Sequence, residues 1–260
     1  RRDANGAFGL GTTTPNYAWD FVNNKARFNN INYGALSSTP GWTFSRASTG
    51  YAQTSAGVLV PFASGELRRT DKGVLIEGAR TNLCLQSQTF DNASWTKATA
   101  TVTADAIAAP DGTTTADKLV EDTSNAQHRL NQAITVSNTT AYTCSVYAKA
   151  AGRHLQVRIS TATDVGVAFF DLTAGTVASN TAGTASIQAL ANGWYRCILT
   201  GTTDSTTATI RLNAVQTDNV TNTYTGDGTS GIYTWGAQLE AASFPSSYIP
   251  TTTASATRAA

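Results

Sequence analysis

Few residues of this chain are of the types that perform acid–base or nucleophilic chemistry. It has two histidines, His128 and His154, among 260 residues. His128 precedes Arg129 in a strand-like run and His154 follows a Gly-Arg turn, so we expect each at the surface or at a strand edge. There is no Gly-x-Ser-x-Gly elbow, no His-Glu-x-x-His helix and no phosphate-cradling glycine loop. The sequence therefore predicts no hydrolase, metalloprotease or nucleotide chemistry of these kinds.

Glycoside hydrolysis stays open, because it needs only two carboxylates about 5 to 9.5 Å apart. Glu121 and Asp122 are the most suggestive pair, but neighbouring residues of a strand point to opposite faces. Other aspartates stand beside Gly, Asn, Ser or Thr in expected turns, where Asp accepts hydrogen bonds from the backbone. These aspartates are Asp91, Asp105, Asp111, Asp204, Asp218 and Asp227. We expect no catalytic residues and a protein that is not an enzyme.

The three cysteines, Cys84, Cys144 and Cys197, show no metal-binding or redox spacing. Cys144 and Cys197 lie in strand-like runs, in phase with apolar neighbours, which predicts ordinary buried thiols. The alternative is one disulfide, which would leave the third thiol unpaired.

A binding face follows from the phase of four expected strands. In each of them apolar side chains alternate with polar or aromatic ones, which point to the other side of the sheet. If these strands share one sheet, its exposed face carries Tyr147, Lys149, Arg158, Trp194, Arg196 and Arg211. Aromatic rings stack on sugars and arginine forks bind acidic groups, so the set predicts a site for an acidic glycan. The alternative is that the cations only keep the sheet soluble and that Trp194 packs.

The elements that would position these residues are short strands separated by turns. Candidate strands are 116–121, 128–136, 142–149, 155–160, 166–171, 185–189, 194–200, 208–215 and 232–239, preceded by one at 83–90. Turns such as Pro110-Asp111-Gly112 and Asn192-Gly193 separate them, and no amphipathic helix of ten or more residues is seen. Such a series of short strands predicts two packed sheets, an all-β sandwich.

The last of these strands follows the glycine-rich turn Thr225–Gly231. Its alternation predicts that Tyr233, Trp235, Ala237 and Leu239 lie together in the core. The segment is therefore predicted to be a tight turn that leads into a half-buried strand.

The C-terminal part resembles a known family. The turn, the strand up to Glu240 and the segment Phe244–Pro250 resemble the C-terminal signature of bacteriophage tail-fibre and head-fibre (spike) proteins with a carbohydrate-binding-module-like β-sandwich. Gly73–Leu83, with Thr43–Thr49 upstream, is similar to the junction that precedes this sandwich. The resemblance extends from about Trp42 to Ala259. It implies a jelly roll, and it implies binding or display rather than catalysis.

Three regions are expected. Residues 1–83 would form an N-terminal arm, with one short strand at Tyr17–Val22, and a small β-rich connecting or attachment region. Residues 84–250 would form the jelly-roll β-sandwich, and 251–260 a C-terminal tail. The resemblance implies a virion protein, on the exterior of the tail or capsid, in contact with other virion proteins. It also implies a homo-oligomer, with the trimer expected because phage fibres are often trimers.

Composition narrows the partners. Only 13% of the residues are charged and the formal net charge is +1, which argues against nucleic acid as the main partner. No apolar run approaches the ~20 residues that cross a bilayer, so no membrane insertion is expected. No cofactor is expected either. The resemblance suggests Glu240 as one ligand of a structural Ca²⁺, but the sequence lacks an acidic pair around it, which favours a solvated carboxylate at a strand end.

Our main hypothesis is a non-catalytic virion fibre, spike or tail-associated protein that binds a host-surface glycan. A purely structural capsid-decoration or tail-assembly protein is the first alternative, favoured by the weakly charged surface rich in Thr, Ala, Gly and Ser. The second alternative is a binding module of a polysaccharide-degrading enzyme.

Overall fold

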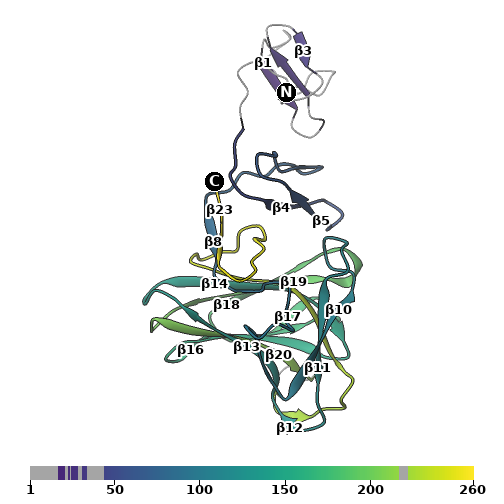
Figure 1. Ribbon diagram of the computed structural model, residues 1–260, viewed down its shortest axis with the longest axis vertical. Helices are drawn as coiled ribbons and strands as arrows, with labels where there is room; N and C mark the ends of the chain where they lie inside the picture. Colours follow the sequence, from purple (N-terminus) through teal and green to yellow (C-terminus); the bar gives the residue numbers. More distant parts are fainter. Residues whose placement is uncertain (1–16, 21–22, 24, 29–30, 34–43, 217–221) are drawn as a thin grey trace.

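The computed structural model describes residues 17–20, 23, 25–28, 31–33, 44–216 and 222–260 of the chain. Most of them form one large β-sandwich, and smaller hairpins lie against one of its faces (Figure 1). We call the two layers the upper and the lower sheet, as they lie in Figure 1. Most of the predicted arm, including residues 21–22 of its expected strand, lies outside the described residues. Its described strands form an antiparallel sheet of β1 (Tyr17–Asp20), β2 (Lys25–Phe28) and β3 (Ile31–Tyr33).

Each sheet of the sandwich has six antiparallel strands. In spatial order, the upper sheet consists of β10 (Ala100–Ile107), β11 (Ala116–Glu121), β22 (Gly231–Glu240), β14 (Ala141–Ala151), β19 (Tyr195–Thr202) and β18 (Thr184–Ala189). The lower sheet consists of β17 (Thr176–Ala182), β16 (Asp164–Asp171), β15 (His154–Ser160), β20 (Thr207–Val215), β13 (His128–Thr135) and β9 (Thr96–Ala98).

Among the described residues, the smaller elements are strand pairs and one short turn of helix. The pairs are β4 (Gly50–Gln53) with β5 (Leu59–Phe62), β6 (Arg69–Thr70) with β7 (Gly73–Val74), β8 (Arg80–Asn82) with β23 (Ala256–Arg258), and β12 (Asn125–Ala126) with β21 (Tyr224–Thr225). The 3₁₀ turn is η2 (Ala191–Gly193). Within the described part of the chain, no helix is long and apolar enough to cross a membrane.

The strand order is that of a jelly roll. Eight central strands form two facing layers, β11-β22-β14-β19 in the upper sheet and β13-β20-β15-β16 in the lower sheet. The chain crosses between the layers from β11 to β13, from β13 to β14 and from β14 to β15, and the last strand, β22, returns beside the first. The predicted all-β jelly-roll sandwich is confirmed.

The inner faces of the two sheets enclose the main core. Cys144, Val146 and Ala148 alternate along β14 and are fully buried, and β15, β19 and β20 contribute apolar side chains in the same alternating way. All three cysteines are buried and free, which confirms the predicted thiols and rules out the disulfide alternative. Burial raises the pKa of the Cys144 thiol to about 12, so this sulfur stays protonated and apolar in character.

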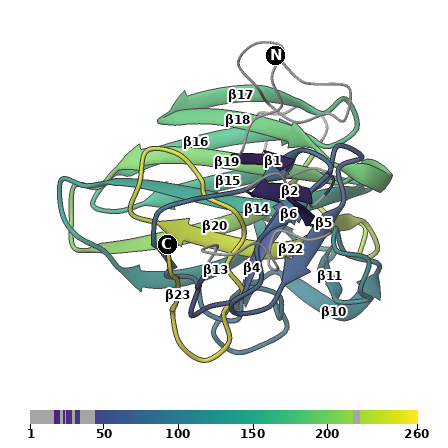
Figure 2. The ribbon, with the colours of Figure 1, turned by 90° about the horizontal axis from the view of Figure 1, so that it is seen from above.

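A second apolar cluster lies on the outer face of the upper sheet. It includes Tyr147, Trp194 and Trp235 of the sandwich, Tyr51 of β4 and Tyr248 of the C-terminal segment. The ring centroids of Trp235 and Tyr248 are 4.6 Å apart, and those of Tyr51 and Tyr248 are 5.3 Å apart. Seen from above, β4, β5 and β23 lie in front of the sandwich (Figure 2). The connecting region and the C-terminal segment therefore cover this face.

Buried charges hold the covering segments in place. The guanidinium of Arg258 on β23 is fully buried and donates hydrogen bonds to Ser247 Oγ at 3.0 Å and to Gly78 O at 2.9 Å. Glu77 accepts hydrogen bonds from Ser247 Oγ at 2.6 Å and from Arg68 Nη1 at 2.5 Å. Burial works to raise the pKa of Glu77, but the hydrogen bonds from Ser247 and Arg68 outweigh it and hold the pKa below its usual value. The segment expected to be a tail thus contributes a buried side chain to this network.

The expected core face of the last strand is wrong in its first half. Leu239 lies in the main core, but Trp235 belongs to the outer cluster and Tyr233 packs against that cluster. Gly236 causes the change, because its φ of 64° forms a bulge where the β14–β22 register shifts. One extra residue reverses the faces on either side of it. A Cβ at Gly236 would also lie 2.9 Å from the Tyr147 ring, which only glycine avoids.

The predicted strands from 116 to 239 match observed strands within about two residues at each end. Three strands of the two sandwich sheets, β9, β10 and β17, are missed. β10 and β17 are edge strands rich in Thr and Ala whose side chains are mostly exposed or half-buried, so they lack an apolar alternation. The strand expected at 83–90 is wrong: bends and turns occur there. Phe90 instead packs on Trp95 with centroids 5.0 Å apart, and both side chains anchor loops in the core.

Candidate functional site

The six predicted ligand-binding residues do not share one face, so this part of the prediction is wrong. Tyr147 and Lys149 lie on β14, with Trp194 and Arg196 beside them at β19, all in the upper sheet. Arg158 on β15 and Arg211 on β20 lie in the lower sheet. All six side chains point away from the core, as their phase predicts, but the chain's crossings place them on opposite sides of the sandwich.

Three of the four upper-sheet members, Tyr147, Trp194 and Arg196, are buried, whereas Lys149 is half-exposed. Tyr147 and Trp194 are each 2% exposed, and the indole nitrogen of Trp194 donates to Ala108 O at 3.2 Å. Lys149 Nζ donates to Asn192 O at 2.8 Å. Trp194 and Tyr147 are thus packing residues of the outer cluster. The alternative that Trp194 packs is therefore confirmed, and the glycan site expected on this face is wrong for Tyr147 and Trp194, because strand phase does not show that another part of the chain covers them.

Arg196 is also buried, at 8% exposure. Its Nη2 donates to Ser145 Oγ at 2.8 Å and to Ser246 O at 2.7 Å, which joins β19, β14 and the C-terminal segment. Its guanidinium carbon lies 5.4 Å from the centroid of the Tyr147 ring. Arg196 Nε is buried and makes no hydrogen bond within the described residues.

The outer face of the lower sheet gathers a different set of polar residues. Arg158 lies directly opposite Arg211 in the β15–β20 ladder, and Arg129 of β13 lies opposite Asn213 on the other side of β20. Asn131 lies opposite Arg211. We call this surface the arginine face, and it consists of Arg129, Asn131, Gln156, Arg158, Arg211 and Asn213.

The arginine face concentrates positive charge. Burial, followed by the charges of Arg211 and Arg158, lowers the pKa of Arg129. Arg158 is paired with Asp164 of β16 through its Nη2. Burial works to raise the pKa of Asp164, but hydrogen bonds from Ser160 and Arg158 outweigh it and lower the pKa. With three arginines and one aspartate this close, the face carries a surplus of positive charge.

Several polar atoms of the face are buried and unpaired. Arg129 Nε, Arg158 Nε, Asn131 Oδ1 and Asn213 Oδ1 make no hydrogen bond within the described part of the chain. Asn213 is fully buried, and its Nδ2 donates to Gln156 Oε1 at 2.5 Å. Arg211 donates no hydrogen bond to any described residue, so its charge has no direct partner there. Unpaired buried polar groups cost free energy and commonly mark where a ligand or water binds.

The chemistry available to this face is recognition of an anion. Arginine forks bind carboxylate, sulfate or phosphate oxygens in paired hydrogen bonds, and asparagine amides suit sugar hydroxyls. Two of the predicted residues, Arg158 and Arg211, belong to the face. Sequence reasoning missed Arg129, Asn131 and Asn213, although each alternates with buried residues of β13 or β20 and that alternation is visible in the sequence.

The two histidines are buried, so the expectation of surface positions is wrong. His128 is fully buried on the inner side of β13, in phase with Leu130, and its Nδ1 lies 2.6 Å from Thr99 O. His154 is 4% exposed, and its Nδ1 accepts the N–H of Leu172 at 3.0 Å. Both rings serve hydrogen bonding within the fold.

The carboxylates behave mostly as predicted. Glu121 is buried and accepts hydrogen bonds from Arg153 Nη2 at 2.5 Å and from the Tyr224 hydroxyl at 2.6 Å. Asp122, just beyond the end of the strand, accepts from Ser124, and its Oδ1 lies 3.5 Å from His128 Nδ1. Among the turn aspartates, Asp111, Asp204 and Asp227 accept backbone N–H groups, as expected. Asp218 lies outside the described residues.

Glu240 is fully buried, so the expected solvated carboxylate is wrong. Its Oε1 accepts hydrogen bonds from Ser246 N at 2.7 Å and from Gln238 Nε2 at 2.8 Å, and its Oε2 accepts from Ser246 Oγ at 2.8 Å. The C-terminal segment folds back over this strand end and supplies these donors. No group of three or more His, Cys, Asp or Glu side chains among the described residues is arranged to hold a metal ion.

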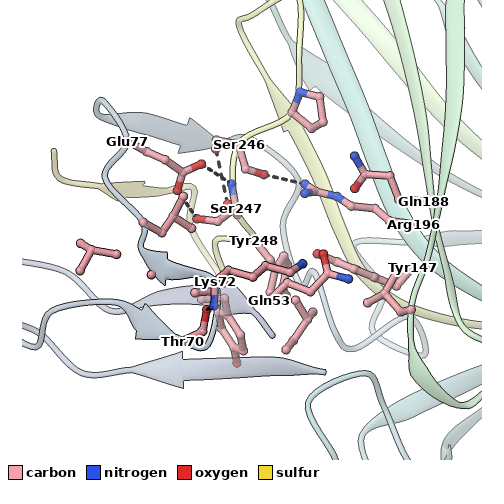
Figure 3. A pocket seen from close by; sticks show the side chains of 18 residues that line it. Gln53, Thr70, Lys72, Glu77, Tyr147, Gln188, Arg196, Ser246, Ser247 and Tyr248 are labelled. Carbon is pink, nitrogen blue, oxygen red and sulfur yellow. Dashed lines mark hydrogen bonds between the residues drawn. The ribbon is translucent and has the colours of Figure 1, made fainter. Parts of the chain in front are cut away.

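A pocket of about 350 Å³ lies between the upper sheet and its cover (Figure 3). Tyr147 and Arg196 line it from the sandwich, Gln53 and Lys72 from the hairpins of the connecting region, and Tyr248 from the C-terminal segment. Two of the predicted residues therefore meet here, in a cavity that strand phase did not indicate.

Comparison with known proteins gives partial structural likenesses. The chain matches no protein-family model and no curated protein. The enzymatically active domain of bacteriophage CBA120 tailspike protein 4 is similar over 61% of this chain and 21% of that chain, at 16% identity and a TM-score of 0.37. This chain thus corresponds to about a fifth of the tailspike chain.

Two further solved structures are similar at comparable levels. One is the CBM22-1 xylan-binding domain of Paenibacillus barcinonensis Xyn10C. The match covers 64% of this chain and 96% of that domain, at 12% identity and a TM-score of 0.39. The other is a putative sugar binding protein of Bacteroides thetaiotaomicron. The match covers 62% of this chain and 100% of that chain, at 13% identity and a TM-score of 0.30. The assignment of the fold rests on this chain's own strand order.

Proposed function

We propose that this chain is a non-catalytic glycan-binding protein that recognises an acidic polysaccharide on the arginine face. One observation carries the proposal: Arg129, Arg158 and Arg211 stand together on one sheet face, beside unpaired buried atoms of Asn131 and Asn213. A carboxylate or sulfate group bound there would offset the mutual repulsion of the arginines, and sugar hydroxyls would pair with the free amide oxygens.

The chemistry of the face favours an acidic ligand over a neutral one. Phe169 of β16 lies opposite Gln156 in the β15–β16 ladder. Its side chain is only 5% exposed, so it offers little ring surface for stacking on a sugar. Affinity would therefore come mainly from charged hydrogen bonds, each worth about 1.5–3 kcal/mol when the groups are desolvated. Binding should accordingly weaken as salt concentration rises.

The biological setting is proposed from the sequence resemblance. A fibre, spike or tail-associated protein on the virion exterior meets acidic polysaccharides of the host surface, and a homo-oligomer, such as a trimer, would present several arginine faces at once. The described carboxylates that come nearest to an acid–base pair, Glu121 and Asp122, already accept hydrogen bonds from Arg153 and from Ser124, which supports a non-catalytic role.

Affinity electrophoresis through gels that contain an acidic polysaccharide, such as polygalacturonate or the host capsule, tests the proposal. We expect retardation in these gels and none in neutral dextran. The double variant Arg129→Gln/Arg211→Gln should lose the retardation. The matched control Lys118→Gln/Lys149→Gln removes the same charge from the upper sheet and should keep it. Equal retardation of both double variants would refute the proposed site, and no retardation of the native chain would refute the function.

A further inference from the structure

We infer that the pocket between the connecting region and the upper sheet is a second ligand site, which takes a single sugar residue that carries a carboxylate. Its volume of about 350 Å³ is within the range of ~300–1,000 Å³ typical of small-molecule sites. The pocket lies on the outer side of the upper sheet, whereas the arginine face is the outer side of the lower sheet (Figure 1). It is therefore a separate site from the one in the proposed function.

The pocket holds two cations and no free carboxylate. Lys72 is exposed, and its Nζ forms no hydrogen bond or ion pair with any described residue. Arg196 is held through Nη2 alone, and its Nε is buried without a partner in the described chain. The one carboxylate in the lining, Glu77, is already neutralised by Arg68 at 2.5 Å, with Arg258 3.5 Å away. The lining thus presents a net positive charge to an occupant, which favours a carboxylate.

The remaining groups suit a ring that bears hydroxyls. Figure 3 shows the side chains of Lys72, Gln53 and Tyr147 directed toward the same part of the pocket, with the Arg196 guanidinium nearby. The Tyr147 hydroxyl and the Gln53 amide form no side-chain hydrogen bond with described residues. Apolar walls stand between these polar groups, from Tyr51, Leu59, Leu75 and Tyr248. A few placed polar groups in a mainly apolar concavity are typical of sites for small ligands.

The pocket also joins three parts of the fold. Its walls come from residues 51–77 of the connecting region, 147–196 of the sandwich and 245–248 of the C-terminal segment. A ligand that touches all three binds only when the connecting region is docked on the upper sheet. By mass action, occupancy must therefore stabilise the docked arrangement. The position of the sandwich relative to the segment that precedes it would then depend on the sugar.

Calorimetric titration of the full chain with glucuronate tests the inference, and glucose serves as the neutral probe. We expect glucuronate to bind at least tenfold more tightly than glucose, because only its carboxylate can form charged hydrogen bonds with Lys72 and Arg196. Lys72→Ala and Arg196→Gln should each weaken glucuronate binding at least tenfold. Lys149→Ala, which removes a charge on the same sheet outside the pocket, should leave it unchanged.

A folding defect in one variant can be told apart from a loss of binding. Arg196 donates hydrogen bonds to Ser145 and Ser246, so Arg196→Gln could also lower stability. Lys72→Ala is free of this problem, because the exposed Lys72 side chain forms no hydrogen bond with described residues. Glucuronate at a concentration equal to its Kd for the native chain should raise the melting temperature of the native chain and of Lys149→Ala clearly more than that of Lys72→Ala. Unchanged affinity in Lys72→Ala, no affinity of the native chain, or equal affinity for glucose would each overturn the inference.

The titrations are repeated in the Arg129→Gln/Arg211→Gln variant, which removes the arginine face as a second acceptor of glucuronate. Glucuronate binding should persist there with the same affinity. Its loss in this variant would place the sugar on the arginine face and overturn the pocket inference alone. Persistence of glucuronate binding in a chain that no acidic polysaccharide retards would overturn the proposed function alone.

Discussion

Replacement of Arg211 by glutamine is predicted to stabilise the fold while it weakens glycan binding. Arg211 stands directly opposite Arg158, and it is one of the two charges that lower the pKa of Arg129 after burial itself. Its side chain donates no hydrogen bond to described residues, so the substitution removes no contact of that kind. A residue whose charge opposes folding is expected where that charge serves a ligand.

The size of the effect follows from the register. Like charges directly opposite across an antiparallel ladder cost roughly 0.2–1 kcal/mol, and the second repulsion, with Arg129, adds a similar amount. Part of this is offset because Asp164 loses the attraction of Arg211 while it keeps its bond to Arg158. The net gain is about 0.3–1.5 kcal/mol, which corresponds to about 1–6 °C in melting temperature for a domain of this size.

Urea denaturation and calorimetry at low and high salt measure this gain. The native chain should gain more stability from salt than Arg211→Gln does, because salt screens the repulsion that the substitution removes. Lys118→Gln, a charge removal on the upper sheet, is the control and should reproduce neither the gain nor the loss of glycan retention. A fall in the free energy of unfolding, or unchanged glycan retention in Arg211→Gln, would refute the reasoning.

Three further predictions concern the cover of the upper sheet. Arg258→Ala breaks a fully buried charge network and should lower the free energy of unfolding in urea by about 3–5 kcal/mol; a change below 1 kcal/mol would mean that β23 adds little to the fold. Gly236→Ala forces a φ of 64° on alanine and a 2.9 Å contact with Tyr147, so it should cost at least ~1–3 kcal/mol and lower the melting temperature. Because the folded-state pKa of Glu77 lies below its usual 4.5, its contribution is fully present above that value and is lost as the pH falls through the lowered pKa. Glu77→Gln should therefore flatten the dependence of stability on pH in acid, and an unchanged acid titration would contradict this.

The positions of strands can be predicted from the sequence where one face of the strand is buried. Val146 and Ala148 on β14, and Val157 and Ile159 on β15, alternate with polar residues, and this period marks both strands. Edge strands such as β10 and β17 bury little and therefore carry no such period. The bulge at Gly236 was also unreadable, because a glycine in a strand gives no sign of how it shifts the faces.

The candidate site could be predicted from the sequence only in part, for a different reason. Phase shows that Tyr147 and Arg158 point away from the core, but a sandwich has two outer faces and phase does not say which one a strand joins. The burial of Tyr147 and Trp194 depends on segments far away in the sequence, Tyr51 and Tyr248, which dock over them. Such docking arises from tertiary packing and leaves no local pattern.

A crystal structure of the chain with an acidic oligosaccharide, such as trigalacturonate, tests the proposed function most directly. We expect a sugar carboxylate within hydrogen-bond distance of Arg211 and of Arg129 or Arg158, with hydroxyls at Asn131 or Asn213. A trisaccharide bound on another surface while the arginine face stays empty, or a neutral trisaccharide bound in the same place with equal affinity, would contradict it.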